Sequence, residues 1–76
     1  MTENELGTTL AEMYNTALKN EKVVHIHLFG IKYGDVILSN KYNIKNIIKA
    51  SNLPESYSTE LSKSVKLSNY VSIKQR

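Results

Sequence analysis

Apolar residues recur at the three- and four-residue spacing of an α-helix in three separate stretches of this chain. The first stretch carries its apolar side chains at Leu6, Leu10, Met13, Tyr14, Ala17 and Leu18. Such a stripe predicts an amphipathic helix with one buried face. Thr2 or Asn4 can cap the start of this helix, and we expect it to end near Asn20.

The stretch 23–33 is apolar at both the helical and the strand period. As a strand it would place Val24, Ile26 and Leu28 on one face, and its β-branched residues favour that interpretation. As a helix it would be buried on nearly all sides. We favour the helix, because a lone central strand would have no partner except the C-terminal tail.

Two short segments after this stretch have the composition of turns. We expect turns at Gly34-Asp35 and at residues 39–41. The apolar residues between them, 36–38, would either extend the preceding helix or form a brief strand. In either case the whole stretch from residue 23 belongs to the core.

The segment 44–67 has the layout of a helix-turn-helix, with a short helix, a tight turn and a second helix. Asn43 can cap the first helix, and Asn52 is suited to the left-handed backbone that the turn requires. Pro54 can open the second helix as its first residue or lie just before it, and Ser56 is a further candidate cap. The apolar residues that anchor the two helices are Ile44, Ile47 and Ile48 in the first and Tyr57, Leu61 and Val65, with Leu67 as a further candidate, in the second.

The second helix, about residues 55–68, would act as a recognition helix in the major groove of DNA. Hydroxyl groups can bond to base edges or phosphates, and lysines can neutralise phosphates. The candidate DNA contacts are Ser56, Ser58, Thr59, Ser62, Lys63 and Lys66 on this helix, with Lys45 and Lys49 on the preceding one. Glu55 and Glu60 would repel phosphate, and the region lacks arginine. A monomer would therefore bind weakly, and two copies on adjacent half-sites would compensate.

Charge is divided unevenly along the chain. Residues 1–40 hold three lysines and five acidic residues, a net charge of −2, whereas residues 41–76 carry +5. A basic second half favours a polyanion as partner. The alternative interpretation is a lysine-rich surface that only faces solvent.

Length and composition narrow the class of protein further. A chain of 76 residues has room for one domain, residues 1–76, and its apolar fraction of 41% is typical of a folded one. The lack of cysteine fits the cytoplasm, and no apolar run approaches the roughly 18 residues of a membrane span. We find no nucleophile paired with a base and no glycine-rich phosphate loop, so we expect no enzyme, no cofactor and no small-molecule substrate.

The two histidines and five tyrosines suggest other chemistry. On a strand His25 and His27 would share a face, but two ligands are too few for a closed zinc site, so we expect no metal. Tyrosines can stack on bases. Most are expected to pack their rings in the core instead, with Tyr42 and Tyr70 less constrained.

Residues 22–33 and 53–67 together resemble a group of short bacterial proteins described only as helix-turn-helix-like. The resemblance covers roughly residues 5 to 73. It implies a helical fold of the helix-turn-helix or winged-helix type and a DNA-binding role. It brings no ligand or catalytic residues.

The sequence thus predicts an all-α fold of about four helices with a helix-turn-helix at 44–67. Residues 70–74 alternate in polarity and would form a short C-terminal strand or vestigial wing. The function we expect is binding of double-stranded DNA by a small transcriptional regulator, as a homodimer if two half-sites are read. The alternative is a protein-interaction or dimerisation module of the same fold that does not bind nucleic acid.

Overall fold

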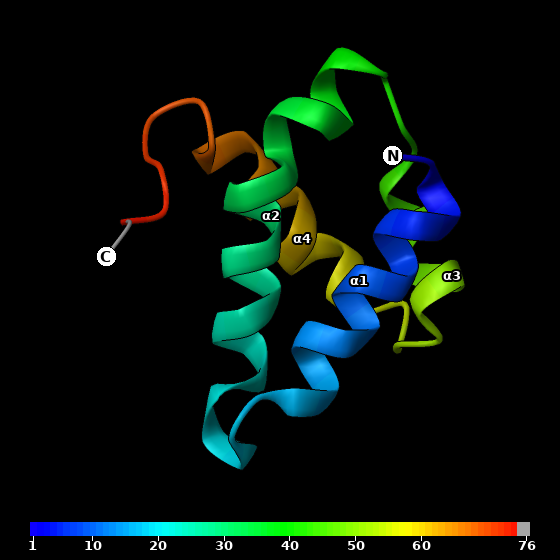
Figure 1. Ribbon diagram of the computed structural model, residues 1–76, viewed down its shortest axis with the longest axis vertical. Helices are drawn as coiled ribbons and strands as arrows, with labels where there is room; N and C mark the ends of the chain where they lie inside the picture. Colours follow the sequence, from blue (N-terminus) through cyan, green and yellow to red (C-terminus); the bar gives the residue numbers. More distant parts are fainter. Residues whose placement is uncertain (75–76) are drawn as a thin grey trace.

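The computed structural model describes residues 1–74, and its regular elements are helices joined by short connections (Figure 1). The helices are α1 (Glu3–Thr16), α2 (Lys22–Ser39), α3 (Ile44–Ser51) and α4 (Tyr57–Leu67), with a short 3-10 turn, η1 (Lys19–Glu21), before α2. No strand forms within residues 1–74. The prediction of an all-α fold with four helices is confirmed.

Helix α1 begins with the predicted cap at Thr2. The Glu5 amide donates to the Thr2 hydroxyl at 3.1 Å, and the Thr2 amide donates to the Glu5 carboxylate at 2.8 Å. These bonds form a capping box and lower the pKa of Glu5. Helix α1 ends at Thr16, earlier than predicted, and the backbone becomes extended at Ala17. The Lys22 ammonium donates to the carbonyls of Tyr14 and Ala17 at 2.9 and 3.4 Å, which satisfies groups at this end of the helix. Leu18 consequently lies outside the helix and is 67% exposed.

Helix α2 includes the stretch 23–33, which the sequence left open between helix and strand, and continues without a break to Ser39. The predicted turn at Gly34-Asp35 is therefore wrong, and residues 36–38 extend the helix. Gly34 is buried, and a β-carbon built on it would collide with the Ser68 side chain that follows α4. Glycine at this position thus serves close packing between helices, not a turn.

The turn expected at residues 39–41 is present and ends α2. Lys41 adopts a left-handed backbone with φ of 55°. The Tyr42 amide donates to the Ile37 carbonyl at 3.0 Å, and the Lys41 amide donates to the Leu38 carbonyl at 3.2 Å. This is the hydrogen-bond pattern of a Schellman motif, in which glycine usually occupies the position of Lys41.

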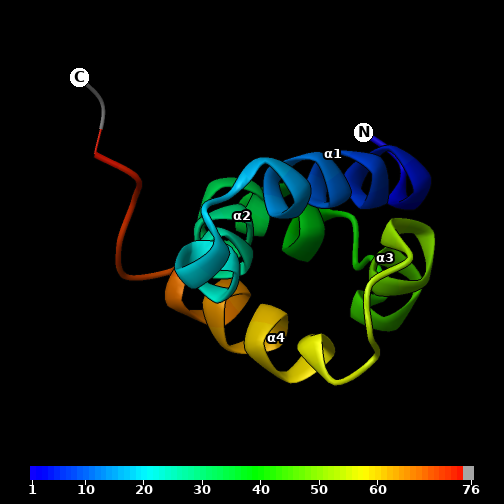
Figure 2. The same ribbon diagram turned by 90° about the horizontal axis from the view of Figure 1, so that it is seen from below.

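The four helices surround one apolar core. Seen from below, α1, α3, α4 and α2 follow one another around a common centre (Figure 2). The side chains that fill this centre are Leu6, Leu10, Ile26, Phe29, Ile37, Ile47, Ile48, Leu61 and Val65. Helix α2 packs mainly against α4, and α1 packs mainly against α3.

The tail after α4 does not form the predicted strand or wing. Residues 71–74 have no regular structure, and Tyr70 is 84% exposed. A strand needs a partner for its backbone groups, and the rest of the described chain is helical, so alternation of polarity alone cannot produce one.

Candidate nucleic-acid interface

The helix-turn-helix segment begins at Asn43, which caps α3 as predicted. Its side-chain oxygen accepts from the amides of Lys45 at 2.8 Å and Asn46 at 3.3 Å. The Glu3 carboxylate, at the start of α1, accepts from the Asn43 amide at 2.7 Å and from the Asn46 side chain at 3.2 Å. The start of α3 is therefore fixed to the start of α1 by contacts that sequence spacing alone does not reveal.

The turn between α3 and α4 has the predicted left-handed residue, with a φ of 61° at Asn52. Ser51 is buried, and its hydroxyl donates to the Ile48 carbonyl at 2.6 Å and accepts from the Leu53 amide at 3.2 Å. Leu53 packs against the core. Ser56 precedes α4, but its side chain makes no capping hydrogen bond, so the prediction of a cap at Ser56 is wrong.

Helix α4 buries the face that its spacing predicts. Leu61 and Val65 are 0% and 3% exposed, whereas Leu67 is 45% exposed at the end of the helix. The hydroxyls of Tyr57 and Tyr14 lie 3.0 Å apart and tie the start of α4 to α1. This hydrogen bond, together with burial, raises the pKa of Tyr14. Helix α4 is thus docked in one orientation, with its opposite side turned outward.

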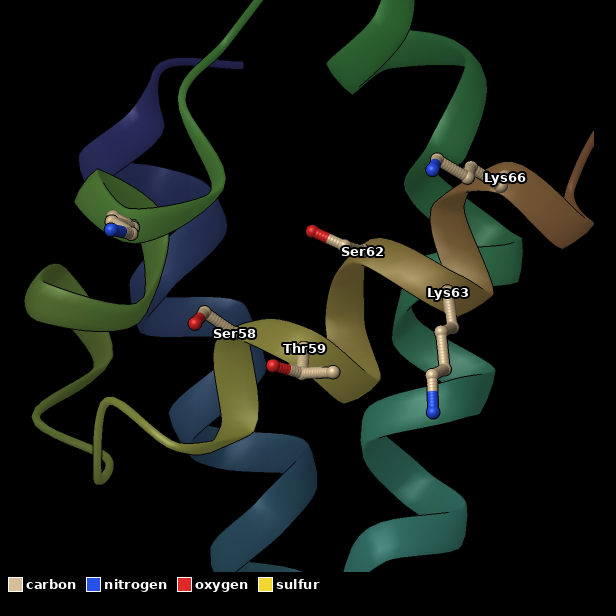
Figure 3. A pocket seen from close by; sticks show the side chains of 6 residues that line it. Ser58, Thr59, Ser62, Lys63 and Lys66 are labelled. Carbon is tan, nitrogen blue, oxygen red and sulfur yellow. The ribbon is translucent and has the colours of Figure 1, made fainter.

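An open groove of about 440 Å³ runs along this outward side. Its lining is polar and basic: Lys45 from α3 and Ser58, Thr59, Ser62, Lys63 and Lys66 from α4. Figure 3 shows the α4 residues on one side of the helix, with the amino groups of Lys63 and Lys66 reaching in different directions. We refer to these six residues as the α3–α4 groove.

Six of the eight predicted contact residues line this groove, and the other two do not. Ser56 is exposed in the connection before α4. Lys49 is exposed one turn after Lys45, on the same side of α3. Lys49 therefore extends the basic surface beyond the groove.

The hydroxyls in the groove differ in how free they are to bind a ligand. Ser58 already donates to the Glu55 carbonyl at 2.8 Å, so its oxygen is left to accept. Within residues 1–74 the hydroxyls of Thr59 and Ser62 make no hydrogen bond. Since Lys63 is 71% exposed in its side chain, the groove offers both ammonium and hydroxyl groups to an anionic ligand.

Comparison with known proteins agrees with this arrangement. A family model described as an HTH-like domain matches residues 2–74. The chain belongs to the HTH-like domain family. No curated protein and no solved structure matched it. In this HTH-like domain the helix-turn-helix pair is α3 and α4.

The two acidic residues near the start of α4 in this HTH-like domain lie outside the groove lining. Glu55 is exposed in the connection before α4. Glu60 lies on the side of α4 that faces α2, where its carboxylate is 2.9 Å from His27 Nε2 and 3.8 Å from Lys63 Nζ. The hydrogen bond with His27, followed by the charge of Lys63, holds the pKa of Glu60 below its usual value.

Sequence reasoning missed the pairing of His27 with Glu60. The only signal for it was the helical alternative for residues 23–33, which turns the two histidines to different sides.

His25 lines a separate apolar hollow with Met13 and Leu28. Within the described range, no three metal-binding side chains come together. None of the helices in residues 1–74 has the length and hydropathy of a membrane span.

Proposed function

We propose that this HTH-like domain binds double-stranded DNA through the outward side of α4, as a small transcriptional regulator without enzymatic activity. The observation that carries the proposal is the α3–α4 groove. Three lysines from two helices border the same surface as three hydroxyl groups, and this surface belongs to the second helix of a helix-turn-helix. A helix of this kind fits the width of the major groove.

The chemistry of the groove supports a division of roles. Lys45, Lys63 and Lys66 neutralise phosphates and supply affinity that depends on salt. Thr59 and Ser62 face outward between them and bond to base edges or phosphate oxygens. Because the groove has no arginine, which makes the commonest specific contact to guanine, we expect modest sequence preference from a single copy.

Charge reversal on α4 tests the proposal. We expect the double variant K63E/K66E to lose binding to a random-sequence duplex, measured by fluorescence anisotropy at about 50 mM and about 200 mM salt. The matched control is K19E/K32E, which reverses two exposed lysines outside the groove and gives the same net charge, −1 in place of +3. This control separates a local contact from the general effect of charge.

Retained binding by K63E/K66E, or equal loss in both double variants, would remove α4 from the interface. Amide NMR shifts during a DNA titration give an independent map. The largest shifts are expected in α4 and at the start of α3, with little change in α1. Binding of the parent chain that does not weaken with salt would also contradict the proposal, because phosphate contacts release counterions.

A second candidate function, self-association, is favoured by a row of partly exposed apolar side chains along α2. Val24 and Leu38 there are 49% and 45% exposed, and Leu28 and Ile31 are only half-buried. Their spacing of four, three and seven residues is that of a helix-pairing seam. A second copy docked on this side would leave the groove of each copy free for one half-site.

Sedimentation equilibrium tests this second function directly. We expect the parent chain to form dimers and the variant V24E/L38E to remain monomeric and folded. A monomeric parent at high concentration would show that DNA binding, where present, does not depend on pairing through α2.

A further inference from the structure

The contact between His27 and Glu60 joins α2 to the side of α4 next to the groove. The two side chains come from helices that approach closely at small residues, and they remain 40% and 33% exposed. His27 lies one turn before Gly30, and Glu60 lies one turn before Ser64, where the two helices pack most closely. The contact is therefore a direct result of the close approach of α2 and α4.

Glu60 lies so near the groove that the orientation of its carboxylate affects the binding of an anion there. It neighbours Thr59 in sequence and lies one turn before Lys63, both of which line the groove. Its second carboxylate oxygen is 3.8 Å from the Lys63 ammonium. A carboxylate that moved closer to Lys63 would compete with a phosphate for the same cation.

Space for such a movement exists beside the pair. A hollow of about 370 Å³ is lined by His27, Glu60, Lys63, Ser64 and Leu67. The Lys63 side chain is exposed and long, so it can follow the carboxylate into this hollow or extend outward. The hydrogen bond between His27 Nε2 and Glu60 Oε1 keeps this carboxylate oxygen against α2.

We propose that His27 is a positioning residue for the DNA-binding surface: it holds the Glu60 carboxylate against α2, so that Lys63 remains available to a phosphate. This inference rests on the proposed function: His27 regulates the access of a phosphate to the Lys63 ammonium. His27 itself does not line the groove.

Five variants, measured by the same anisotropy assay, test the role of His27. H27A frees the carboxylate and should weaken duplex binding about two- to fivefold, the range expected for one exposed ion pair. H27Q keeps a donor near the position of Nε2 and should bind like the parent. E60Q removes the competing charge, and H27A/E60Q should bind as well as E60Q alone.

The variants H27A/E60Q and H27Q distinguish positioning from a merely structural effect. If H27A acted by loosening the fold, its loss of affinity would persist in H27A/E60Q, and H27Q would not restore binding. H25A is the matched control, because it removes the other histidine of α2 from a separate hollow, and it should leave affinity unchanged.

The outcomes also separate this inference from the proposed function. Failure of the parent chain to bind duplex DNA would overturn both. Salt-dependent binding by the parent together with unchanged binding by H27A would overturn only the role of His27. A double variant H27A/E60Q as weak as H27A would overturn it as well.

Discussion

Gly30 of α2 lies so close to Ser64 of α4 that a β-carbon on the glycine would overlap the serine side chain. Gly34 of α2 and Ser68, which directly follows α4, have the same relationship. The Ser64 hydroxyl is buried and donates to the Leu61 carbonyl at 2.9 Å, so it satisfies its own polarity within α4. Small residues on both helices thus set the distance between α2 and α4.

Gly30→Ala is expected to destabilise the protein although alanine favours helices. Alanine gains about 1 kcal/mol in helix propensity over glycine. Forcing a methyl group against Ser64 costs about 1–3 kcal/mol, because the added methyl also meets the Val65 backbone nitrogen, at 3.1 Å. We expect the steric cost to prevail, and urea denaturation measures the sign directly.

The double variant G30A/S64G serves as the control for this explanation. Removing the serine side chain clears the space that the new methyl group needs most, so the double variant should recover the part of the loss that comes from Ser64. It retains the propensity cost of a glycine in α4. A G30A protein more stable than the parent would show that the two helices separate without cost.

Leu61→Ala should lower the free energy of unfolding by about 2–5 kcal/mol, because Leu61 is fully buried where α4 meets the core. Leu67→Ala is the matched control on the same helix. Leu67 is 45% exposed, so its truncation should change the denaturation midpoint little. Equal effects of the two substitutions would mean that α4 is not docked by the Leu61 side.

Features that depend on local sequence were predicted well. Thr2 and Asn43 cap helices because their side chains reach amides two or three residues ahead. Asn52 takes the left-handed backbone because asparagine tolerates it better than most residues. The division of α4 into buried and outward sides follows from helical spacing, which also puts the five α4 residues of the groove on the outward side.

Features that depend on contacts between distant segments were not predictable in the same way. Gly34-Asp35 has the composition of a turn, but the pairing of Gly34 with Ser68 determines its role inside α2. The alternation in the tail predicted a strand that finds no partner among residues 1–74. His27 and Glu60 are 33 positions apart, and no local pattern shows that they meet.

Lys41→Gly is expected to stabilise the protein by about 1 kcal/mol. Lys41 occupies the left-handed position of the Schellman motif that ends α2, where a β-carbon is unfavourable and glycine is relaxed. Lys41→Ala is the control, because it removes the same charge and keeps the β-carbon. Thermal denaturation should rank the glycine variant above the parent and the alanine variant no higher than the parent.

The ion pair of Glu60 predicts a dependence of stability on pH. The pKa of Glu60 in the folded protein is lowered, first by its hydrogen bond with His27 and then by Lys63. A carboxyl group with a lowered folded-state pKa contributes stability above its ordinary pKa, 4.5, and loses that contribution as the pH falls through the folded value. The difference in stability between the parent and E60Q should therefore shrink as the pH falls from neutral to below 4.5.

Urea midpoints of parent and variants across this acid range provide the measurement. Glu5 also has a lowered pKa, from its capping box with Thr2, so E60Q should keep part of the acid sensitivity of the parent. Glu12→Gln removes an exposed carboxylate from α1 and should follow the parent curve. A parent and an E60Q variant that differ by the same amount at every pH would show that Glu60 is not held as an ion by His27 and Lys63 in solution. In that case the carboxylate would already be free to compete for Lys63, and removing His27 could not release it further.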